Sequence, residues 1–473
     1  MTTTQARARS SAGTEREARL LAALRDRMRG EVIDRDHPNY HAARQVWNGL
    51  IDHHPAVIAR CQCTADVVAA VGVANEHRPT VSIRGGGHQV AGSSVVEDGL
   101  VIDLSHMKGV RVDPVAGSAW AQSGVTWGEL DRETQLFGLV TPGGEVSTTG
   151  IAGFTLGGGM GLTMRAYGLA CDNLRSIQIV TADGVVRTAS RSENPELFWA
   201  ARGGGRGLGV VTGFEFDLHP LGPDVAVAQV LYPYKDAAAV ARAWREVAAA
   251  APDQLAPELA LWSIPADPGL PAELHGEKVV LVAGLYAGPP DDARTVLSSL
   301  RELGTPLADL SGTAPYLAVQ SELDAMFPAG GRYYMKSHFL DVLSDEVIDA
   351  LLVADADRPT PETLTVVRTL GGAVARAGAD ESAYAHRSAS YNVSIDAGWT
   401  DPALDEQAIG WARATWDALR PHATGGVYVN FSGLDDDVDD TRDAVYGTSR
   451  QRLEQVRRAY DPDGLFEAAA QRS

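Results

Sequence analysis

The chain has 473 residues, of which 45% are hydrophobic, a typical globular composition, and the length suits two or three domains. The 41 lysines and arginines against 61 aspartates and glutamates give a formal net charge of −20, which argues against nucleic acid or an anionic membrane as a partner. No stretch of 18 apolar residues is present and the three cysteines make no disulfide framework, so we expect a cytoplasmic protein without a transmembrane helix.

The first part of the chain alternates the patterns of helix and strand. A polar tail leads into an expected helix near Ala18 to Arg29, and apolar residues at helical spacing predict a second helix within 66–80. Further expected elements are strands at 81–84, 99–105 and 209–220, a short helix at 194–202, and a hairpin at 176–190 that turns at Asp183 and Gly184. These patterns predict an α+β domain.

The pattern changes near Leu221. Helices at 236–251 and 345–356 are expected to alternate with strands at 278–287, 363–376 and 391–399. This predicts a second domain in which an antiparallel sheet is covered on one side by helices. A strand at 426–433, in which Tyr428 and Asn430 should share a face, and a helix at 448–460 follow.

The acidic segment 434–440 lacks the glycine and the spacing of an EF-hand. We expect a solvated loop there, and no metal site in the chain.

Four glycine clusters lie in the first part, at 85–87, 143–144, 157–161 and 203–209. Glycine-rich turns let backbone N–H groups point together at an anion. None of the clusters matches a P-loop or a G-x-G-x-x-G fingerprint. One such cluster alone would be read as a tight turn, but four in one domain indicate an extended ligand touched by several turns, such as a dinucleotide.

Four segments together resemble the berberine bridge enzyme-like branch of FAD-linked oxidases, in the vanillyl-alcohol oxidase superfamily. They are SIRGGGHQVAGSS, TPGGEVSTTGIAGFTLGGGMGLTMRAYGLACDNL, ELFWAARGGGRGLGVVTGFEFDLHP and the terminal YVNF…YGTSRQRLEQVRRAYDPDGLF. The resemblance runs from about residue 40 to 466, and it points to the bacterial branch of 6-hydroxynicotine oxidase-like and secondary-metabolite flavin oxidases.

The resemblance implies an α+β fold with a PCMH-type FAD-binding domain of two α/β subdomains and a separate substrate domain. The expected limits are 1–35 for the tail and first helix, 36–220 for the FAD-binding domain, 221–426 for the substrate domain, and 427–473 for a segment that completes the FAD-binding domain.

By the same resemblance, His88 is the residue bonded through a ring nitrogen to the flavin 8α-methyl group. A second link would need a cysteine where Val146 stands, so we expect a single 8α-histidyl link. Further contacts to FAD are implied for Arg84, Gly85, Gly86, Gly87, Ser93, Pro142, Gly143, Gly153, Gly157, Gly158, Gly161, Tyr167, Gly168, Asp172, Val211, Tyr428 and Asn430. Gly207 and Leu208 stand where the family usually carries Asn-Phe, so no role is carried onto Gly207.

Tyr428 is the first candidate for the catalytic base, because the family directs a tyrosine at the substrate from this position. Lys336 is the second, and His338 and Asn392 are candidate substrate contacts. Asn392 stands where several plant relatives carry a catalytic glutamate, and an amide cannot accept the proton. We expect His386 to be structural.

The resulting hypothesis is an FAD-dependent oxidoreductase that oxidises a small organic substrate of secondary metabolism by hydride transfer to covalently bound FAD. O2 would accept the electrons and give H2O2, and the chain would be a monomer or a homodimer. A flavin-dependent oxygenase, or a dehydrogenase with another acceptor, is the alternative. Thr149 favours an oxidase, because a small residue at this position leaves oxygen access in the plant branch.

Overall fold

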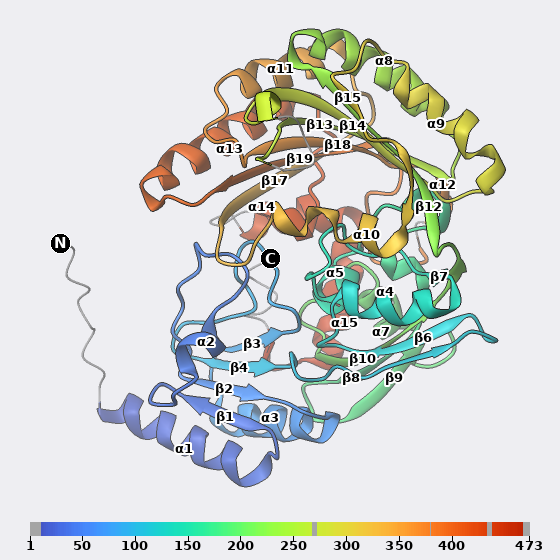
Figure 1. The fold of residues 1–473 in the computed structure, drawn as a ribbon. Helices are drawn as coiled ribbons and strands as arrows, with labels where there is room; N and C mark the ends of the chain where they lie inside the picture. Colours follow the sequence, from blue (N-terminus) through green and yellow to red (C-terminus); the bar gives the residue numbers. More distant parts are fainter. Residues whose placement is uncertain (1–10, 267–271, 379, 433–437, 467–473) are drawn as a thin grey trace.

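The computed structural model describes residues 11–266, 272–378, 380–432 and 438–466. Its strands form three sheets and one isolated pair (Figure 1). Residues 434–437 of the predicted acidic loop lie outside the described residues and stay a prediction, whereas residues 438–440 begin helix α14 (Val438–Tyr446), so a loop is wrong for that part.

The first sheet has the strand order β1-β2-β4-β3. Its strands are β1 (Glu31–Asp34), β2 (Val57–Arg60), β3 (Val81–Arg84) and β4 (Leu100–Asp103). The pairs β2–β4 and β3–β4 are parallel, whereas β1 runs antiparallel to β2. Helices α1 (Ser11–Arg27) and α3 (Thr64–His77) pack their apolar residues into the same core as this sheet.

The second sheet is antiparallel, with the order β5-β6-β10-β8-β9. Its strands are β5 (Val110–Asp113), β6 (Ser118–Gln122), β8 (Leu174–Val180), β9 (Val186–Ser190) and β10 (Val210–Asp217). Its core includes residues of α4 (Trp127–Thr134), α7 (Pro195–Ala201) and α15 (Arg450–Tyr460). Helix α15 therefore packs with strands and helices from the first half of the chain.

The third sheet is antiparallel and has eight strands. The path is β15 (Ala308–Asp309), β12 (Asp224–Pro233), β14 (Lys278–Tyr286), β13 (Leu255–Ser263), β18 (Leu364–Thr369), β19 (Tyr391–Trp399) and β17 (Arg332–Leu340), with β16 (Gly312–Pro315) also paired to β12. Four helices cover its outer face: α8 (Ala237–Ala250), α9 (Ala293–Arg301), α11 (Asp345–Ala356) and α13 (Asp405–Leu419) (Figure 1). Its inner face turns toward the other two sheets, and the α+β fold class is confirmed.

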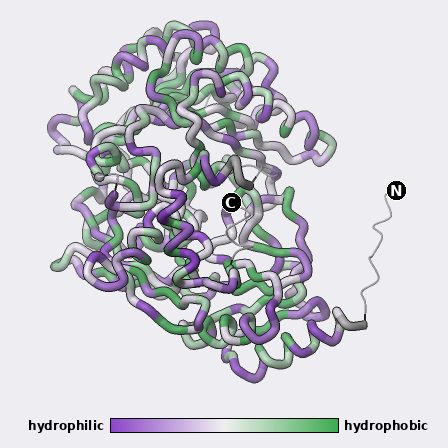
Figure 2. Tube along the Cα trace, turned by 180° about the vertical axis from the view of Figure 1, so that it is seen from behind, coloured by the Kyte–Doolittle hydropathy of each residue, from purple (hydrophilic) through white to green (hydrophobic). Residues whose placement is uncertain are grey.

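Short elements connect these layers. They are α2 (Tyr40–Arg44), α5 (Ile151–Leu156), α6 (Met164–Tyr167), α10 (Tyr316–Gln320), α12 (Gly372–Arg376), α14 (Val438–Tyr446) and the strand pair β7 (Leu139–Val140) with β11 (His219–Pro220). Among the described residues, no helix is long and apolar enough to cross a membrane. Hydrophilic and hydrophobic segments alternate along the outer helices in Figure 2.

Three predicted elements differ from the structure. The first helix lies at 11–27 rather than 18–29, and the strand expected to run to residue 376 ends at Thr369, before α12. The strand expected at 426–433 is wrong: residues Val429–Phe431 form a 3-10 helix. The backbone N–H of Tyr428 donates to the side-chain oxygen of Ser337, and that of Phe431 donates to the carbonyl of Tyr428. These bonds replace a strand ladder.

Candidate active site

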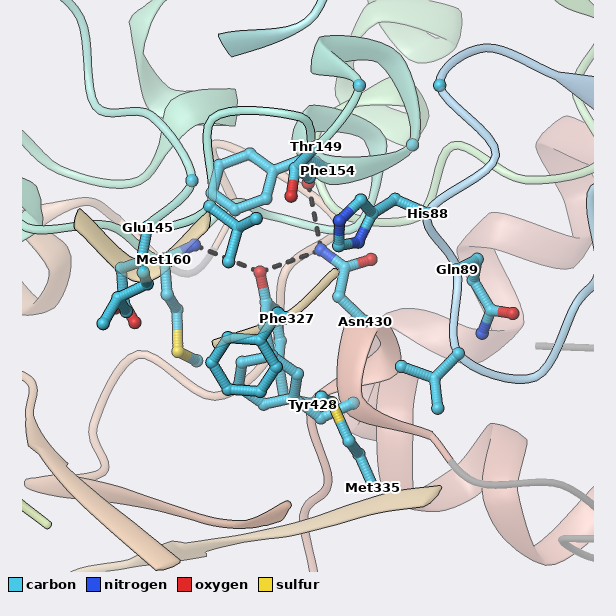
Figure 3. Close-up of a pocket in the computed structure, with 18 of the residues that line it drawn as sticks. His88, Gln89, Glu145, Thr149, Phe154, Met160, Phe327, Met335, Tyr428 and Asn430 are labelled. Carbon is cyan, nitrogen blue, oxygen red and sulfur yellow. Dashed lines mark hydrogen bonds between the residues drawn. The ribbon is translucent and has the colours of Figure 1, made fainter. Parts of the chain in front are cut away.

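A cavity of about 350 Å³ lies between the inner face of the third sheet and the glycine-rich loops of the other two sheets. The loop side includes Gly85, Gly86, Gly87, His88, Ser93, Thr149, Gly150, Gly153, Gly205, Arg206, Gly207, Gly209 and Val211. The sheet side includes Glu258, Ala260, Trp262, Met335, Val366, Arg368 and Asp396. Tyr428 and Asn430 enter from the C-terminal segment (Figure 3). Phe431 of the same segment also lines the cavity.

The turn after β3 brings two loops into backbone contact. A Cβ atom on Gly86 would lie 2.6 Å from backbone atoms of Gly150, so only glycine permits this approach. Gly87 has a φ of +70°, which glycine adopts without strain. The backbone N–H groups of Gly86, Gly87 and His88 donate no hydrogen bond to another described residue, which leaves them available to a ligand at the cavity wall.

His88 lies at the end of this turn, and its side chain is half-buried. Its ring stacks on Trp47, with centroids 4.1 Å apart and an interplanar angle of 16°. Trp47 stacks in turn on Tyr333, at 4.1 Å and 6°. His88 Nε2 lies 3.3 Å from Thr148 Oγ1. Burial lowers the pKa of His88 to about 4, so the imidazole is neutral at pH 7 and keeps one nitrogen lone pair.

Arg84 was predicted to contact FAD, but its side chain points away from the cavity. Its Nε and Nη2 donate to the two carboxylate oxygens of Asp103, at 3.1 and 2.5 Å, and its Nη1 donates to the carbonyls of Ala43 and Gln45. The pair is buried, and the arginine holds the pKa of Asp103 below its usual value. Arg84 therefore anchors the turn from behind.

The other predicted FAD contacts divide into two groups. Those that line the cavity are Gly85, Gly86, Gly87, His88, Ser93, Gly153, Val211, Tyr428 and Asn430. Those that do not line it are Arg84, Pro142, Gly143, Gly157, Gly158, Gly161, Tyr167, Gly168 and Asp172.

Several members of the second group hold loops in place. Asp172 pairs with Arg387 at 2.6 Å, and Tyr167 stacks on His219 with centroids 4.1 Å apart. A Cβ atom on Gly157 would lie 2.3 Å from Asn430 Oδ1. Glycine at 157 thus leaves room for a side chain that does line the cavity.

Tyr428 and Asn430 converge although they do not lie on a strand. The Tyr428 oxygen accepts hydrogen bonds from the backbone N–H of Met160 at 3.1 Å and from Asn430 Nδ2 at 2.9 Å (Figure 3). It also accepts one from the backbone N–H of Gly159 at 3.0 Å. Asn430 Nδ2 also donates to the carbonyl of Phe154. Burial raises the pKa of Tyr428 to about 12, against the lowering effect of these donors, so the side chain is a phenol at neutral pH.

Two predicted candidates lie on the wrong face of β17. Met335 faces the cavity, so by alternation Lys336 and His338 face the helix layer. The Lys336 ammonium lies 4.3 Å from the ring centroid of Trp416 on α13, and His338 stacks on the same ring at 4.6 Å. Neither lines the cavity, which corrects their predicted roles at the flavin and substrate.

Asn392 and His386 also lie outside the cavity lining. Asn392 shares the inner face of β19 with Asp396, but it is fully buried, and its Nδ2 donates to the carbonyl of His338. His386 Nε2 lies 3.0 Å from the carbonyl of Val445, as fits the structural role expected for it.

A charged cluster on the sheet side of the cavity was missed by the sequence analysis. Arg368 Nε and Nη2 donate to the carboxylate of Glu145 at 3.0 and 2.8 Å, and Nε lies 3.6 Å from Glu258. Arg368 Nη1 donates to Ser394 Oγ, which donates to Asp396 Oδ2 at 2.8 Å. Charged residues inside otherwise apolar strands, as in PELALW and SIDAGW, were the available signal.

The carboxyl groups of this cluster have perturbed pKa values. Burial and the charge of Glu145 raise the pKa of Glu258 to about 8. Burial raises the pKa of Asp396 to about 6. Asp396 is 5% exposed, and its Oδ1 has no hydrogen-bond partner among the described residues. Such groups in a cleft are candidates for proton transfer or for binding a hydrogen-bond donor.

The three cysteines Cys61, Cys63 and Cys171 are free thiols. Cys61 and Cys171 are buried, and burial raises the pKa of both well above the usual value. No group of metal-ligating side chains with the composition of a metal site occurs among the described residues.

The residues of the cavity fit a flavin dinucleotide. Unpartnered backbone N–H groups on a glycine turn suit an anionic diphosphate. A neutral imidazole at the wall, with an apolar set that includes Trp262, Phe327 and Phe431, suits an aromatic ring system.

Known proteins that are similar to this chain include FAD-linked enzymes, in agreement with a cavity that fits a flavin dinucleotide. Residues 55–190 match the family model described as FAD binding domain. The FAD-linked oxidoreductase YgaK of Bacillus subtilis is 30% identical over 449 residues, which cover 93% of this chain and 96% of that protein. The (R)-6-hydroxynicotine oxidase of Paenarthrobacter nicotinovorans is 38% identical over 194 residues, which cover 41% of this chain and 42% of that protein.

Solved structures with the same fold cover almost the whole chain. BBE-like 1 of Physcomitrella patens superposes with a TM-score of 0.84 at 23% identity, over 94% of this chain and 97% of that one. The 6-hydroxy-D-nicotine oxidase of Arthrobacter nicotinovorans gives a TM-score of 0.81 at 27% identity, over 93% and 96% of the two chains.

Proposed function

Because the chain belongs to the FAD-linked oxidoreductases, we propose that it oxidises a small organic substrate by hydride transfer to FAD that is bonded covalently to His88. In this proposal O2 accepts the electrons and H2O2 is the product. The resemblance to secondary-metabolite flavin oxidases supports a substrate from secondary metabolism.

The observation that carries this proposal is the placement of His88. A neutral imidazole, held flat against Trp47, closes a glycine turn whose N–H groups have no partner in the described chain. A ring nitrogen with a free lone pair is the form needed for a bond to carbon. None of the three free cysteines, Cys61, Cys63 and Cys171, lines the cavity.

When bound, FAD supplies a two-electron acceptor: a substrate carbon gives it a hydride, and the electrons pass on to O2, which takes up two protons as H2O2. The protein must orient the substrate C–H bond and remove the proton that accompanies the hydride. The Gly86 and Gly87 N–H groups would hold the diphosphate, and Val211 would lie on the adenine side.

Asp396 is the proposed proton acceptor. Its Oδ1 is buried in the cavity wall without a partner, while its Oδ2 is held by Ser394. With a pKa of about 6 it is mostly ionised at pH 7, which suits a general base. Lys336 has no part in this proposal because it faces α13.

Tyr428 is the second proposed catalytic residue. Three N–H groups donate to the oxygen of Tyr428, so the hydroxyl hydrogen of Tyr428 points away from these donors. The phenol then donates a hydrogen bond to the substrate oxygen or nitrogen and stabilises the charge that builds up there.

An oxygenase, or a dehydrogenase that uses another acceptor, is the competing proposal. Thr149 lines the cavity, and its small side chain supports oxygen access and therefore an oxidase.

The test uses the purified yellow holoprotein with compounds of several chemical classes. Each compound is assayed anaerobically for bleaching of the flavin and aerobically for H2O2. An oxidase bleaches with its substrate, is reoxidised rapidly by air, and releases one H2O2 per substrate. Slow reoxidation in air would contradict the oxidase proposal, and a hydroxylated product without H2O2 would establish an oxygenase.

A further inference from the structure

Arg206 is the one cavity-lining cation among the described residues that lacks a counter-charge. It lies in the loop before β10, between Gly205 and Gly207, and all three residues line the cavity. The other arginine of the lining, Arg368, is neutralised by the carboxylate of Glu145. No lysine of the described part of the chain lines the cavity.

The Arg206 side chain makes no hydrogen bond and no ion pair with another described residue. Its Nη1 is buried, so water does not compensate for the missing partner. Arg206 as a whole is partly buried, and a guanidinium nitrogen that is buried without an anion is costly, because it loses hydration and gains no ion pair. Within the described ranges, the charged or ionisable groups that act on it through space are the phenols of Tyr428 and Tyr446 and the guanidinium of Arg457, and none of these is a carboxylate.

A second arginine fixes the loop that carries Arg206. Arg457 on α15 donates from Nε to the carbonyl of Arg206 at 3.0 Å and from Nη2 to the carbonyl of Gly204 at 3.4 Å. Glycine is required nearby: Gly207 has a φ of +79°, and a Cβ atom on Gly205 would lie 2.5 Å from Leu156. The loop is therefore held in place with its arginine directed at the cavity.

Charge is segregated along the cavity. The carboxyl groups of Glu145, Glu258 and Asp396 gather at the sheet side, whereas Arg206 stands on the loop side with the unpartnered N–H groups of Gly86 and Gly87. In a chain of net charge −20, such a local cation creates a place where an anion is stable.

We propose that Arg206 is an anion-binding residue for FAD, and that its guanidinium pairs with a negatively charged group of the bound cofactor. This rests on the proposed function, since it takes FAD as the resident cofactor. Two groups of FAD carry the required charge, namely the diphosphate at all times and the ring system after reduction.

The test compares Arg206→Gln, which removes the charge, with Arg206→Lys, which keeps it. The control is Arg294→Gln, which changes an exposed arginine on α9. The full-length chain with His88→Ala provides a background in which cofactor binding is reversible. Titrations with FAD, ADP and riboflavin report on the whole cofactor, the diphosphate and the ring.

If Arg206 pairs with the diphosphate, Arg206→Gln weakens binding of FAD and ADP about ten- to hundredfold and leaves riboflavin unchanged, because a charge-assisted hydrogen bond is lost. Arg206→Lys retains most of the affinity. If Arg206 pairs with the reduced ring, affinity for oxidised FAD is unchanged, and the reduction potential of the holoprotein falls in Arg206→Gln.

Unchanged FAD and ADP affinities together with an unchanged potential would overturn the proposal. The melting temperature of the apo-protein is a further check, because removal of an unpaired buried charge should not lower it. A drop in that temperature with no change in cofactor binding would mean that Arg206 is structural. If the parent protein binds no FAD at all, the proposed function is wrong. This result differs from FAD binding that is unchanged in Arg206→Gln, which would reject only the role of Arg206.

Discussion

Trp47 lies flat against His88, with ring centroids 4.1 Å apart, and its Nε1 donates to the carbonyl of Phe327 at 2.9 Å. The indole is thus fixed from one side and fixes the imidazole on the other. His88 is on the turn after β3, whereas Phe327 lies between α10 and β17. The stack therefore ties the proposed linkage residue to the chain that leads into the third sheet.

Loss of the stack between Trp47 and His88 should reduce the covalent attachment of FAD to His88. We expect Trp47→Leu to lower the fraction of FAD that stays with the protein after acid precipitation, because the imidazole loses the surface that orients it. Trp47→Phe should retain more of the link, since it keeps an aromatic face. Trp120→Leu, on the part-exposed strand β6, is the control. Full attachment in Trp47→Leu would show that the stack does not orient His88.

Removal of the Tyr428 hydroxyl should slow flavin reduction. We expect Tyr428→Phe to lower the anaerobic reduction rate about 10²-fold or more, with a smaller effect on substrate affinity. Stopped-flow absorbance separates the two effects. The change also leaves the N–H groups of Gly159 and Met160 without an acceptor, so some stability should be lost.

Tyr384→Phe is the matched control for Tyr428→Phe. Tyr384 is buried nearby, and its hydroxyl has no hydrogen-bond partner among the described residues. A reduction rate that falls equally in both variants, or in neither, would remove Tyr428 from the catalytic residues.

The rate of flavin reduction should depend on pH through the ionisation of Asp396. A base with a pKa of about 6 becomes active as pH rises through 6, so the reduction rate should increase with pH and reach a plateau above neutrality. Asp396→Asn should remove this pH limb and lower the plateau about 10²- to 10⁴-fold. Asp349→Asn, at an exposed position on α11, serves as the control. A pH limb that persists in Asp396→Asn would assign the proton to another group.

Stability should depend on pH through Glu258. Its pKa is raised from 4.5 to about 8 in the folded protein, so its contribution to stability is full below pH 4.5 and is lost as pH rises through 8. Glu258→Gln removes this dependence. The melting temperature of Glu258→Gln minus that of the parent should therefore increase as pH rises from 5 to 9. An equal pH dependence of the two melting temperatures would contradict the raised pKa.

Local sequence patterns predicted the parts of the site that depend on a single turn. The run Gly85 to His88 identified a glycine turn with a histidine at its end, and the hairpin turn at Asp183 and Gly184 was also confirmed. Both features are set by backbone conformations that few other residues can adopt.

Features that depend on tertiary pairing were not predictable. Lys336 and Met335 are neighbours in sequence, and only the position of the sheet decides which of them faces the cavity. The cluster around Arg368 joins residues from three strands and one loop. Tyr428 and Asn430 do converge as expected, but through a 3-10 turn that depends on Ser337.

The central claim is that FAD is bonded to His88 and to no other residue. The direct measurement is acid precipitation of the protein followed by digestion and mass spectrometry of the flavin-containing peptides. The prediction is one flavinylated peptide, with the modification on His88 and with Cys61, Cys63 and Cys171 free to alkylate under denaturing conditions. In His88→Ala, FAD should appear in the supernatant. Full release of flavin from the parent protein, or a flavin adduct on any cysteine, would contradict the claim.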